Sequence, residues 1–354
     1  METFELMHGA GLEQIIFFRE DSVDLKAVVA IHNTLLGPAI GGIRVMDYPD
    51  QESMLKDATE LAREMTLRTG LSDCDFGGGS AILCGNSRKG EAYFRAFGRF
   101  INRLAGQFYA IMEVGTDSKD LKHIKRETNY VLALPEAFGG IADPTSITAQ
   151  GLLHGIRATA KIVFGQSSLE NVTCLVQGAG RIGSNIVELL VQAKAKLLVS
   201  DKNYDRIKNI QDRYPEVSMV RPEEVVDTKC DLIVPCALGN LVNSQTVERL
   251  KCRAIAGGAS NIIPDMETGE LLHKHNILYT PHFLIDSGEV IQADYELKKR
   301  SRTLLQSAIG EIYGRTLELL ESARENREPP VKTALRLATE RFANIGSIGR
   351  RISI

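Results

Sequence analysis

A glycine-rich segment near the middle of the chain constrains the fold most. Residues 172–177 form an apolar run that is expected to be a strand, and Gly178-Ala-Gly180-Arg-Ile-Gly183 follows it directly. The spacing is not specific alone, because the chain has 31 glycines. Between a strand and an amphipathic helix, however, it predicts a dinucleotide-binding turn. Gly178 allows the tight turn, Gly180 admits a pyrophosphate to the helix N-terminus and Gly183 lets helix and strand pack closely.

The next predicted strand supports a nucleotide site. Residues 196–200 read Lys-Leu-Leu-Val-Ser and are followed by Asp201, close to the distance expected for the acidic residue that binds the adenosine ribose. Its charge would repel a 2′-phosphate, which favours NAD over NADP, although Lys202 weakens this preference. Arg181 and Ile182 complete the predicted cofactor-binding turn. The alternative is a glycine-rich turn that binds nothing.

The order of predicted elements indicates an α/β protein with two domains. From about residue 145 strands and helices alternate, which predicts a parallel, doubly wound sheet. Before the Gly- and Pro-rich segment 135–144, a strand at 26–32 and helices at 51–68 and 89–105 are expected. We therefore expect a cleft between an N-terminal α/β domain for substrate binding and oligomerisation and a Rossmann domain that binds the dinucleotide. The expected ranges are 1–140 for the first domain, 145–326 for the Rossmann domain, and 327–354 for a segment that returns to the first domain.

Composition excludes several classes of protein. The net charge of −3 and pI of about 6.2 give no field that would attract nucleic acid or an anionic membrane. No run reaches the roughly 18 apolar residues of a membrane span, and the N-terminus lacks the pattern of a signal peptide. The six cysteines form no C-x-x-C pair, which favours free thiols in a reduced cytoplasm. His273 and His275 are a weak signal for a metal, and we expect none.

Several segments, in the same order, resemble the leucine/phenylalanine/valine dehydrogenases, relatives of glutamate dehydrogenase. They are Gly37-Pro-Ala-Ile-Gly-Gly-Ile-Arg44, Val114-Gly-Thr116, the loops around Cys236 and Asn261, and Pro281–Val290. The resemblance covers nearly the whole chain. It implies an NAD-dependent oxidoreductase acting on CH–NH2 or C=N donors, a small substrate with a carboxylate, and a homo-oligomer, either dimer or octamer. It assigns substrate contacts to Gly41, Gly42, Met65, Arg68, Asn261 and Val290, and further cofactor contacts to Thr148, Cys236, Ala237 and Asn261.

The departures from the family lie at its catalytic positions. The family's carboxylate-binding lysine is Arg68, its catalytic lysine after a glycine triplet is Ser80, and its aspartate before Val-Gly-Thr is Glu113. We expect the triplet, residues 77–79, to be a tight turn that brings backbone close to a ligand. Arg68 can bind a carboxylate through its guanidinium fork, or pair with Glu64 or Asp73 at the surface. A serine hydroxyl, in contrast, is no general base near neutral pH without a partner.

These departures leave three functions open. Hydride transfer does not need the lysine, so we expect reduction or oxidation of a carboxylate-bearing imino, keto or amino acid, with Glu113 as proton donor and ordinary oxidative deamination impaired. The first alternative is an inactive pseudoenzyme that binds NAD or an amino acid and regulates or scaffolds a partner. The second is an ordinary branched-chain or aromatic amino-acid dehydrogenase in which another group replaces the lysine.

Overall fold

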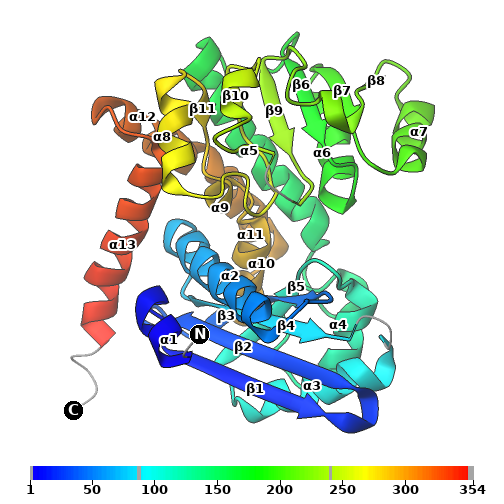
Figure 1. Cartoon of the computed structure of the whole chain (residues 1–354), viewed down its shortest axis with the longest axis vertical. Helices are drawn as coiled ribbons and strands as arrows, with labels where there is room; N and C mark the ends of the chain where they lie inside the picture. The colour runs from blue at the N-terminus through cyan, green and yellow to red at the C-terminus, as the bar shows by residue number, and fades with distance from the viewer. Residues whose placement is uncertain (1–2, 86–88, 239–240, 350–354) are drawn as a thin grey trace. The chain divides into compact units, whose positions relative to one another are not determined.

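The computed structural model describes residues 3–85, 89–238 and 241–349. The chain forms two compact units (Figure 1). The first unit contains the chain up to Pro144, residues Glu289–Leu305 and the C-terminal helix from Leu337. The second contains Thr145–Gly288 and Gln306–Arg336. Within the described ranges, every helix is too short or too polar to cross a membrane.

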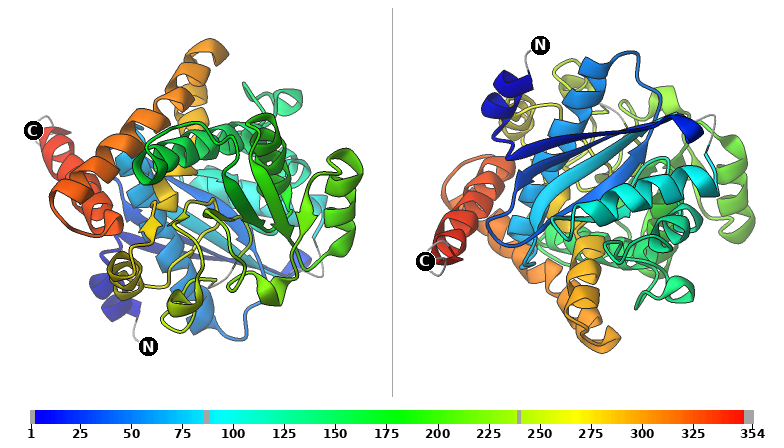
Figure 2. Two further views of the ribbon diagram at one scale, coloured as in Figure 1. Left: turned by 90° about the horizontal axis from the view of Figure 1, so that it is seen from above. Right: turned by 90° about the horizontal axis from the view of Figure 1, so that it is seen from below.

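The first unit is built on a five-stranded mixed sheet with helices on both faces (Figure 2). Strand β2 pairs antiparallel with both β1 and β4, and β3 pairs in parallel with β4 and β5. Side chains of β2 alternate between two cores, because successive residues of a strand face opposite sides: Val28 and Ala30 pack with α2, whereas Val29 and Ile31 pack with α3. In sheet order the strands are β1 (Gln14–Glu20), β2 (Leu25–Asn33), β4 (Gly77–Cys84), β3 (Ala39–Val45) and β5 (Phe108–Met112); the helices are α1 (Thr3–Ala10), α2 (Gln51–Leu71), α3 (Glu91–Arg103) and α4 (Ser118–Lys125).

The glycine triplet is part of a strand, so the prediction of a tight turn is wrong. Residues 77–79 open β4, in extended backbone. A Cβ atom on Gly77 would lie 1.7 Å from the carbonyl oxygen of Asn33, and one on Gly78 would lie 2.2 Å from the backbone nitrogen of Thr66. The glycines are needed because β2 and α2 approach this backbone too closely for any side chain. The glycines therefore allow β4 to pack closely against β2 and α2.

The second unit contains a six-stranded sheet that is parallel throughout (Figure 1). Counted along the chain from β6, the sheet order is 3-2-1-4-5-6, which is the doubly wound nucleotide-binding order. The α/β fold with a Rossmann domain is therefore confirmed. The strands in sheet order are β8 (Ser218–Met219), β7 (Lys196–Ser200), β6 (Thr173–Gln177), β9 (Leu232–Pro235), β10 (Ala254–Ile255) and β11 (Leu278–Tyr279); the helices of this unit are α5 (Pro144–Phe164), α6 (Arg181–Gln192), α7 (Tyr204–Arg213), α8 (Met266–Lys274), α9 (His282–Ile285) and α12 (Ile312–Glu325).

Three helices carry the chain from one unit to the other: α10 (Gly288–Leu297), α11 (Arg302–Gly310) and α13 (Pro330–Gly349). The segment expected to return to the first domain, 327–354, joins the first unit only from Leu337. The expected Rossmann range of 145–326 also included residues 289–305, which the structure groups with the first unit. The reason is a set of hydrogen bonds from α10 to loops of that unit. Glu296 accepts from the backbone N–H groups of Ala133 at 2.7 Å and Ile141 at 3.2 Å.

Candidate functional site

The glycines after β6 have distinct physical roles. Gly178 has φ +100°, and a Cβ atom there would lie 2.6 Å from the Cβ of Ala237. A Cβ atom on Gly183 would lie 1.8 Å from the carbonyl oxygen of Gly178, so helix and strand can pack only around a glycine. A Cβ atom on Gly180, in contrast, meets open space, with Arg206 Nη1 as its nearest neighbour at 3.9 Å. This open space at the N-terminus of α6 fits the approach of a pyrophosphate.

A cavity of about 430 Å³ lies at the carboxyl ends of β6 and β7. Asp201 lines it, with its side chain 9% exposed. Its Oδ2 accepts the Ala179 N–H at 2.6 Å, and its Oδ1 accepts the Asn203 N–H at 2.7 Å. Gln177 lines the same cavity, and its buried Oε1 has no hydrogen-bond partner among the described residues. The cavity therefore offers acceptors to the hydroxyl and amino groups of an adenosine, which fits a dinucleotide cofactor.

The other predicted cofactor residues surround the glycine turn or lie elsewhere in the second unit. Cys236 donates its backbone N–H to Gln177 at 2.6 Å, and burial raises the pKa of its thiol to about 12. Ala237 packs against Gly178, as described above. Arg181 and Ile182 form the first turn of α6. Thr148 is buried on α5, and Asn261 has a left-handed backbone with φ +57°.

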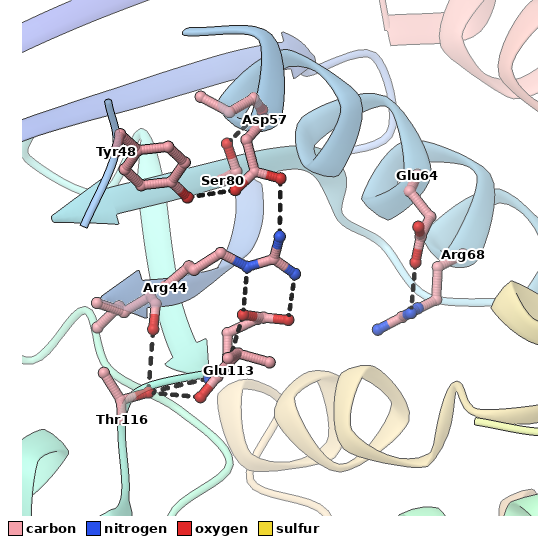
Figure 3. A network of polar contacts seen from close by, with 11 residues as sticks. Arg44, Tyr48, Asp57, Glu64, Arg68, Ser80, Glu113 and Thr116 are labelled. Carbon is pink, nitrogen blue, oxygen red and sulfur yellow. Dashed lines mark hydrogen bonds and ion pairs between the residues drawn. The ribbon is translucent and has the colours of Figure 1, made fainter. Parts of the chain in front are cut away.

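The first unit contains a buried ion-pair network centred on Arg44 (Figure 3). Arg44 Nε and Nη2 each donate at 2.8 Å to a different carboxylate oxygen of Glu113, and Nη1 donates at 2.7 Å to Asp57. The Tyr48 hydroxyl donates to the second oxygen of Asp57. The side chain of Arg44 is only 4% exposed. Burial alone would lower the pKa of Arg44, but its hydrogen bonds and charge interactions with Glu113 and Asp57 raise it. The network is thus a cation held by two carboxylates.

Ser80 lies beside this network but bonds to the backbone. It is on β4 and 1% exposed, and its Oγ donates to the carbonyl oxygen of Ala58 on α2 at 2.6 Å. Figure 3 shows it close to Asp57 and Tyr48.

The space beside the two glycines of β3, Gly41 and Gly42, is occupied by other parts of the protein. A Cβ atom on Gly41 would lie 2.2 Å from the Gly79 carbonyl oxygen, and one on Gly42 would lie 2.6 Å from Glu113.

Arg68 lies further along α2 and pairs with Glu64, 2.9 Å from Nη2 to Oε1 (Figure 3). Both side chains are mostly buried, at 14% and 13% exposure, so this pair is not the surface pair that the sequence allowed. Asp73, the other expected partner, pairs with Arg341 at 3.4 Å. Met65 on α2 and Val290 on α10 are both buried in the first unit. Arg68 therefore stands apart from the Arg44 network, with a carboxylate partner of its own.

Two members of the network were missed by sequence reasoning. Asp57 sits beside Ala58 on the buried face of α2, where a charged residue needs a buried counter-ion. Tyr48 lies in the loop before α2 and carries no sequence signal. Burial, together with the Asp57 carboxylate, raises the pKa of Tyr48, so the hydroxyl is a donor at neutral pH. The charge at position 57 was the available clue, because Met54, Ala58 and Leu61 lie beside it at helical spacing.

Comparisons with known proteins agree with this architecture. Residues 15–130 match the family model "Glu/Leu/Phe/Val dehydrogenase, dimerisation domain", and residues 198–345 match "Glutamate/Leucine/Phenylalanine/Valine dehydrogenase". The chain is 36% identical over 344 residues to a leucine dehydrogenase of Thermoactinomyces intermedius, covering 97% of this chain and 94% of that protein. It is 34% identical over 352 residues to a phenylalanine dehydrogenase of the same organism, covering 99% and 96%.

Solved structures show the same fold. An L-tryptophan dehydrogenase from Nostoc punctiforme is similar with a TM-score of 0.79 and 31% identity, covering 97% of this chain and 99% of that chain. A glutamate dehydrogenase from Thermus thermophilus has a TM-score of 0.80 at 18% identity, which shows the fold alone.

The fold and these matches define the class of amino-acid dehydrogenases, which are oxidoreductases acting on CH–NH2 donors. Within that class, the chain belongs to the Glu/Leu/Phe/Val dehydrogenase family. Its leucine and phenylalanine dehydrogenase members are NAD-dependent. The expected family, reaction class and cofactor are therefore confirmed.

Proposed function

We propose that this chain transfers hydride between NAD and a carboxylate-bearing imino, keto or amino acid, with ordinary oxidative deamination impaired. The observation that carries the second part is Ser80. At the position where the family resemblance places the catalytic lysine, this chain has a buried hydroxyl whose proton is donated to the carbonyl oxygen of Ala58. Since that hydroxyl is already engaged with backbone, it offers no basic group at neutral pH.

The missing base affects one step of the family's reaction. Oxidative deamination requires water to attack the imine, and a positioned general base contributes about 10²–10⁴-fold to such a step. Hydride transfer to or from carbon does not involve that water. Bound NAD supplies or accepts the hydride, and Gly178, Gly180, Gly183 and Asp201 are the residues that would hold it. The chain is therefore suited to the hydride step more than to hydrolysis.

The Arg44 pair makes Glu113 a poor proton donor. Both oxygens of the Glu113 carboxylate accept from Arg44 at 2.8 Å, and proton donation would require this pair to open. An iminium substrate removes the need for proton donation by Glu113. Hydride addition to the iminium carbon converts the C=N bond to a C–N bond and neutralises the nitrogen, with no proton transferred in that step. We therefore propose a preformed imine as the best substrate, with Glu113 holding Arg44.

Arg68 is the proposed contact to the substrate carboxylate. A guanidinium carries five N–H donors in a planar fork, so the 2.9 Å pair with Glu64 is compatible with a second carboxylate. Met65, the residue after Glu64 in α2, and Val290 would provide apolar contacts to the substrate. In the second unit, the resemblance assigns Asn261 to the substrate and the nicotinamide. The substrate class is thus a small carboxylate with an apolar group.

The second candidate function is a binding protein without turnover. All three proposed catalytic side chains already have partners within the protein: Ser80 bonds to Ala58, Glu113 to Arg44 and Arg68 to Glu64. This would suit a chain that binds NAD or an amino acid and regulates a partner. Two results together would favour this candidate. Calorimetry would detect binding of NAD or leucine, and an NADH-oxidation screen over keto acids with ammonia, alkylamines and cyclic imines would detect no turnover.

We also propose that the protein is a homo-oligomer, a dimer or an octamer. The family model matched by residues 15–130 is described as a dimerisation domain. β1 is an edge strand of the first sheet, and it exposes Phe17 at 52%. An exposed edge strand with a large apolar side chain is a surface that a second copy can cover.

The proposed function is tested at position 80. The wild-type protein should oxidise leucine, valine and phenylalanine with NAD at rates near background, and Ser80→Lys should raise them. Arg68→Lys, Ser80→Lys and Glu113→Asp combined should exceed the sum of the single changes, because residues that act as a unit are non-additive. Ser80→Thr is the matched control, since it keeps a hydroxyl. Robust leucine oxidation by the wild type would refute the impairment.

A further inference from the structure

The adenosine end of the cofactor cavity has more positive than negative charge. Its charged lining residues are Asp201, Lys202 and Arg206, which gives two cations against one carboxylate. Arg206 is on the first turn of α7, and its side chain is 53% exposed. Its Nη1 lies 3.6 Å from Asp201 Oδ2 and 3.9 Å from the Cβ position of Gly180. Arg206 thus stands between the ribose-binding carboxylate and the pyrophosphate-binding turn.

Each oxygen of Asp201 already accepts one backbone N–H group. Oδ2 accepts the N–H of Ala179, and Oδ1 accepts the N–H of Asn203. These bonds fix the glycine turn and the start of α7, so Asp201 has a positioning role that does not depend on a ribose. Its repulsion of a further anion is also weakened, because Arg206 and Lys202 lie around it. Asp201 therefore opposes a 2′-phosphate only weakly in this cavity.

We propose that this cavity accepts a 2′-phosphate, so that the protein binds NADP(H) as well as NAD(H), with Arg206 and Lys202 as the phosphate contacts. The inference rests on the proposed cofactor site. A phosphate monoester carries about two negative charges and three acceptor oxygens, which guanidinium and ammonium groups bind through charge-assisted hydrogen bonds. An arginine near the ribose is the feature that accommodates a 2′-phosphate in doubly wound folds. Asp201 can remain bonded to Ala179 and Asn203 throughout.

Titration of the full-length protein with NADH and NADPH, followed by nicotinamide fluorescence, tests the proposal. The chain has no tryptophan, so the protein contributes little background to this signal. We expect dissociation constants within about tenfold of each other. Arg206→Gln should weaken NADPH binding by about tenfold or more and change the NADH dissociation constant by less than about threefold, since an exposed charge pair is partly screened by water. Lys202→Gln should act in the same direction.

Arg213→Gln is the matched control, because Arg213 ends the same helix and pairs with Glu188 at 4.0 Å, away from the cavity lining. Calorimetry with adenosine 2′,5′-bisphosphate and with AMP examines the phosphate site without the nicotinamide. Tighter binding of the bisphosphate, lost in Arg206→Gln, supports the proposal even if no substrate is turned over. NADPH binding more than about a hundredfold weaker than NADH, or equal losses for both cofactors in Arg206→Gln, would overturn it. Failure of all four ligands to bind would overturn it together with the proposed function.

Discussion

Removal of the Arg44 side chain should reveal how strongly the first unit depends on its buried ion-pair network. Arg44→Met keeps much of the length of the side chain but deletes three charge-assisted hydrogen bonds, two to Glu113 and one to Asp57. It leaves two carboxylates whose side chains are only 17% and 19% exposed without their cation. Breaking a buried pair by removal of one partner costs about 3–5 kcal/mol, mainly because the other charge stays buried.

The expected loss for Arg44→Met is therefore about 3–5 kcal/mol in the free energy of unfolding of the first unit. For a unit of this size, each kcal/mol lowers the melting temperature by about 2–4 °C. Glu113→Gln should cost less, because the arginine keeps its bond to Asp57. In the double variant the two losses should not add, and a coupling energy of about 0.5–3 kcal/mol should remain.

Urea unfolding followed by far-ultraviolet circular dichroism measures these losses, with calorimetric scans as a second readout. Arg19→Met is a matched control, because Arg19 forms its ion pair with Asp21 at the surface. A loss below about 1 kcal/mol for Arg44→Met, similar to that of the control, would show that the Arg44 network behaves like an exposed ion pair. Full additivity of Arg44→Met and Glu113→Gln would likewise refute a direct interaction.

Three further predictions concern the nucleotide turn, assembly and acid stability. Gly183→Ala should destabilise the second unit, because its Cβ would lie 1.8 Å from the Gly178 carbonyl oxygen. Gly180→Ala should fold normally yet lose NADH affinity. Equal behaviour of the two variants in thermal melts and NADH titrations would contradict the assigned roles. Light scattering should give a multiple of the 38.9 kDa chain mass, and a monomer would refute the proposed oligomer. Burial, and then the charge of Arg63, lower the pKa of His32 below 6.5, so stability should fall as the pH drops below that value; His32→Gln should lose less stability in acid, and an unchanged acid profile would contradict this.

The sequence predicted the second unit in more detail than the first. The apolar runs before Gly178 and Asp201 became β6 and β7, because a parallel sheet covered on both faces needs continuous apolar strands. The short edge strand β8 was missed, since Ser218 and Met219 are exposed and carry no apolar pattern. Residues 289–305 were assigned to the wrong unit, because the hydrogen bonds of Glu296 to distant loops leave no periodic signal.

The residues of the candidate site could be identified from the sequence, but most of their contacts in the folded chain could not. Motif spacing identified the glycines and Asp201, since each has a role fixed by local backbone geometry. The glycine triplet was misjudged as a turn, because sequence cannot tell a turn from a strand packed tightly against a helix. The pairing of Glu113 with Arg44 joins residues 69 positions apart, and a contact between distant elements has no signature in a single sequence.

We propose above that this chain retains hydride transfer but lacks an efficient water step. The most direct measurement compares two initial rates of the wild-type protein: NADH oxidation with a preformed cyclic imine that bears a carboxylate, and NAD reduction with leucine. We expect imine reduction to exceed leucine oxidation by about 10²-fold or more, the contribution expected from the missing base. Leucine oxidation as fast as imine reduction would contradict it.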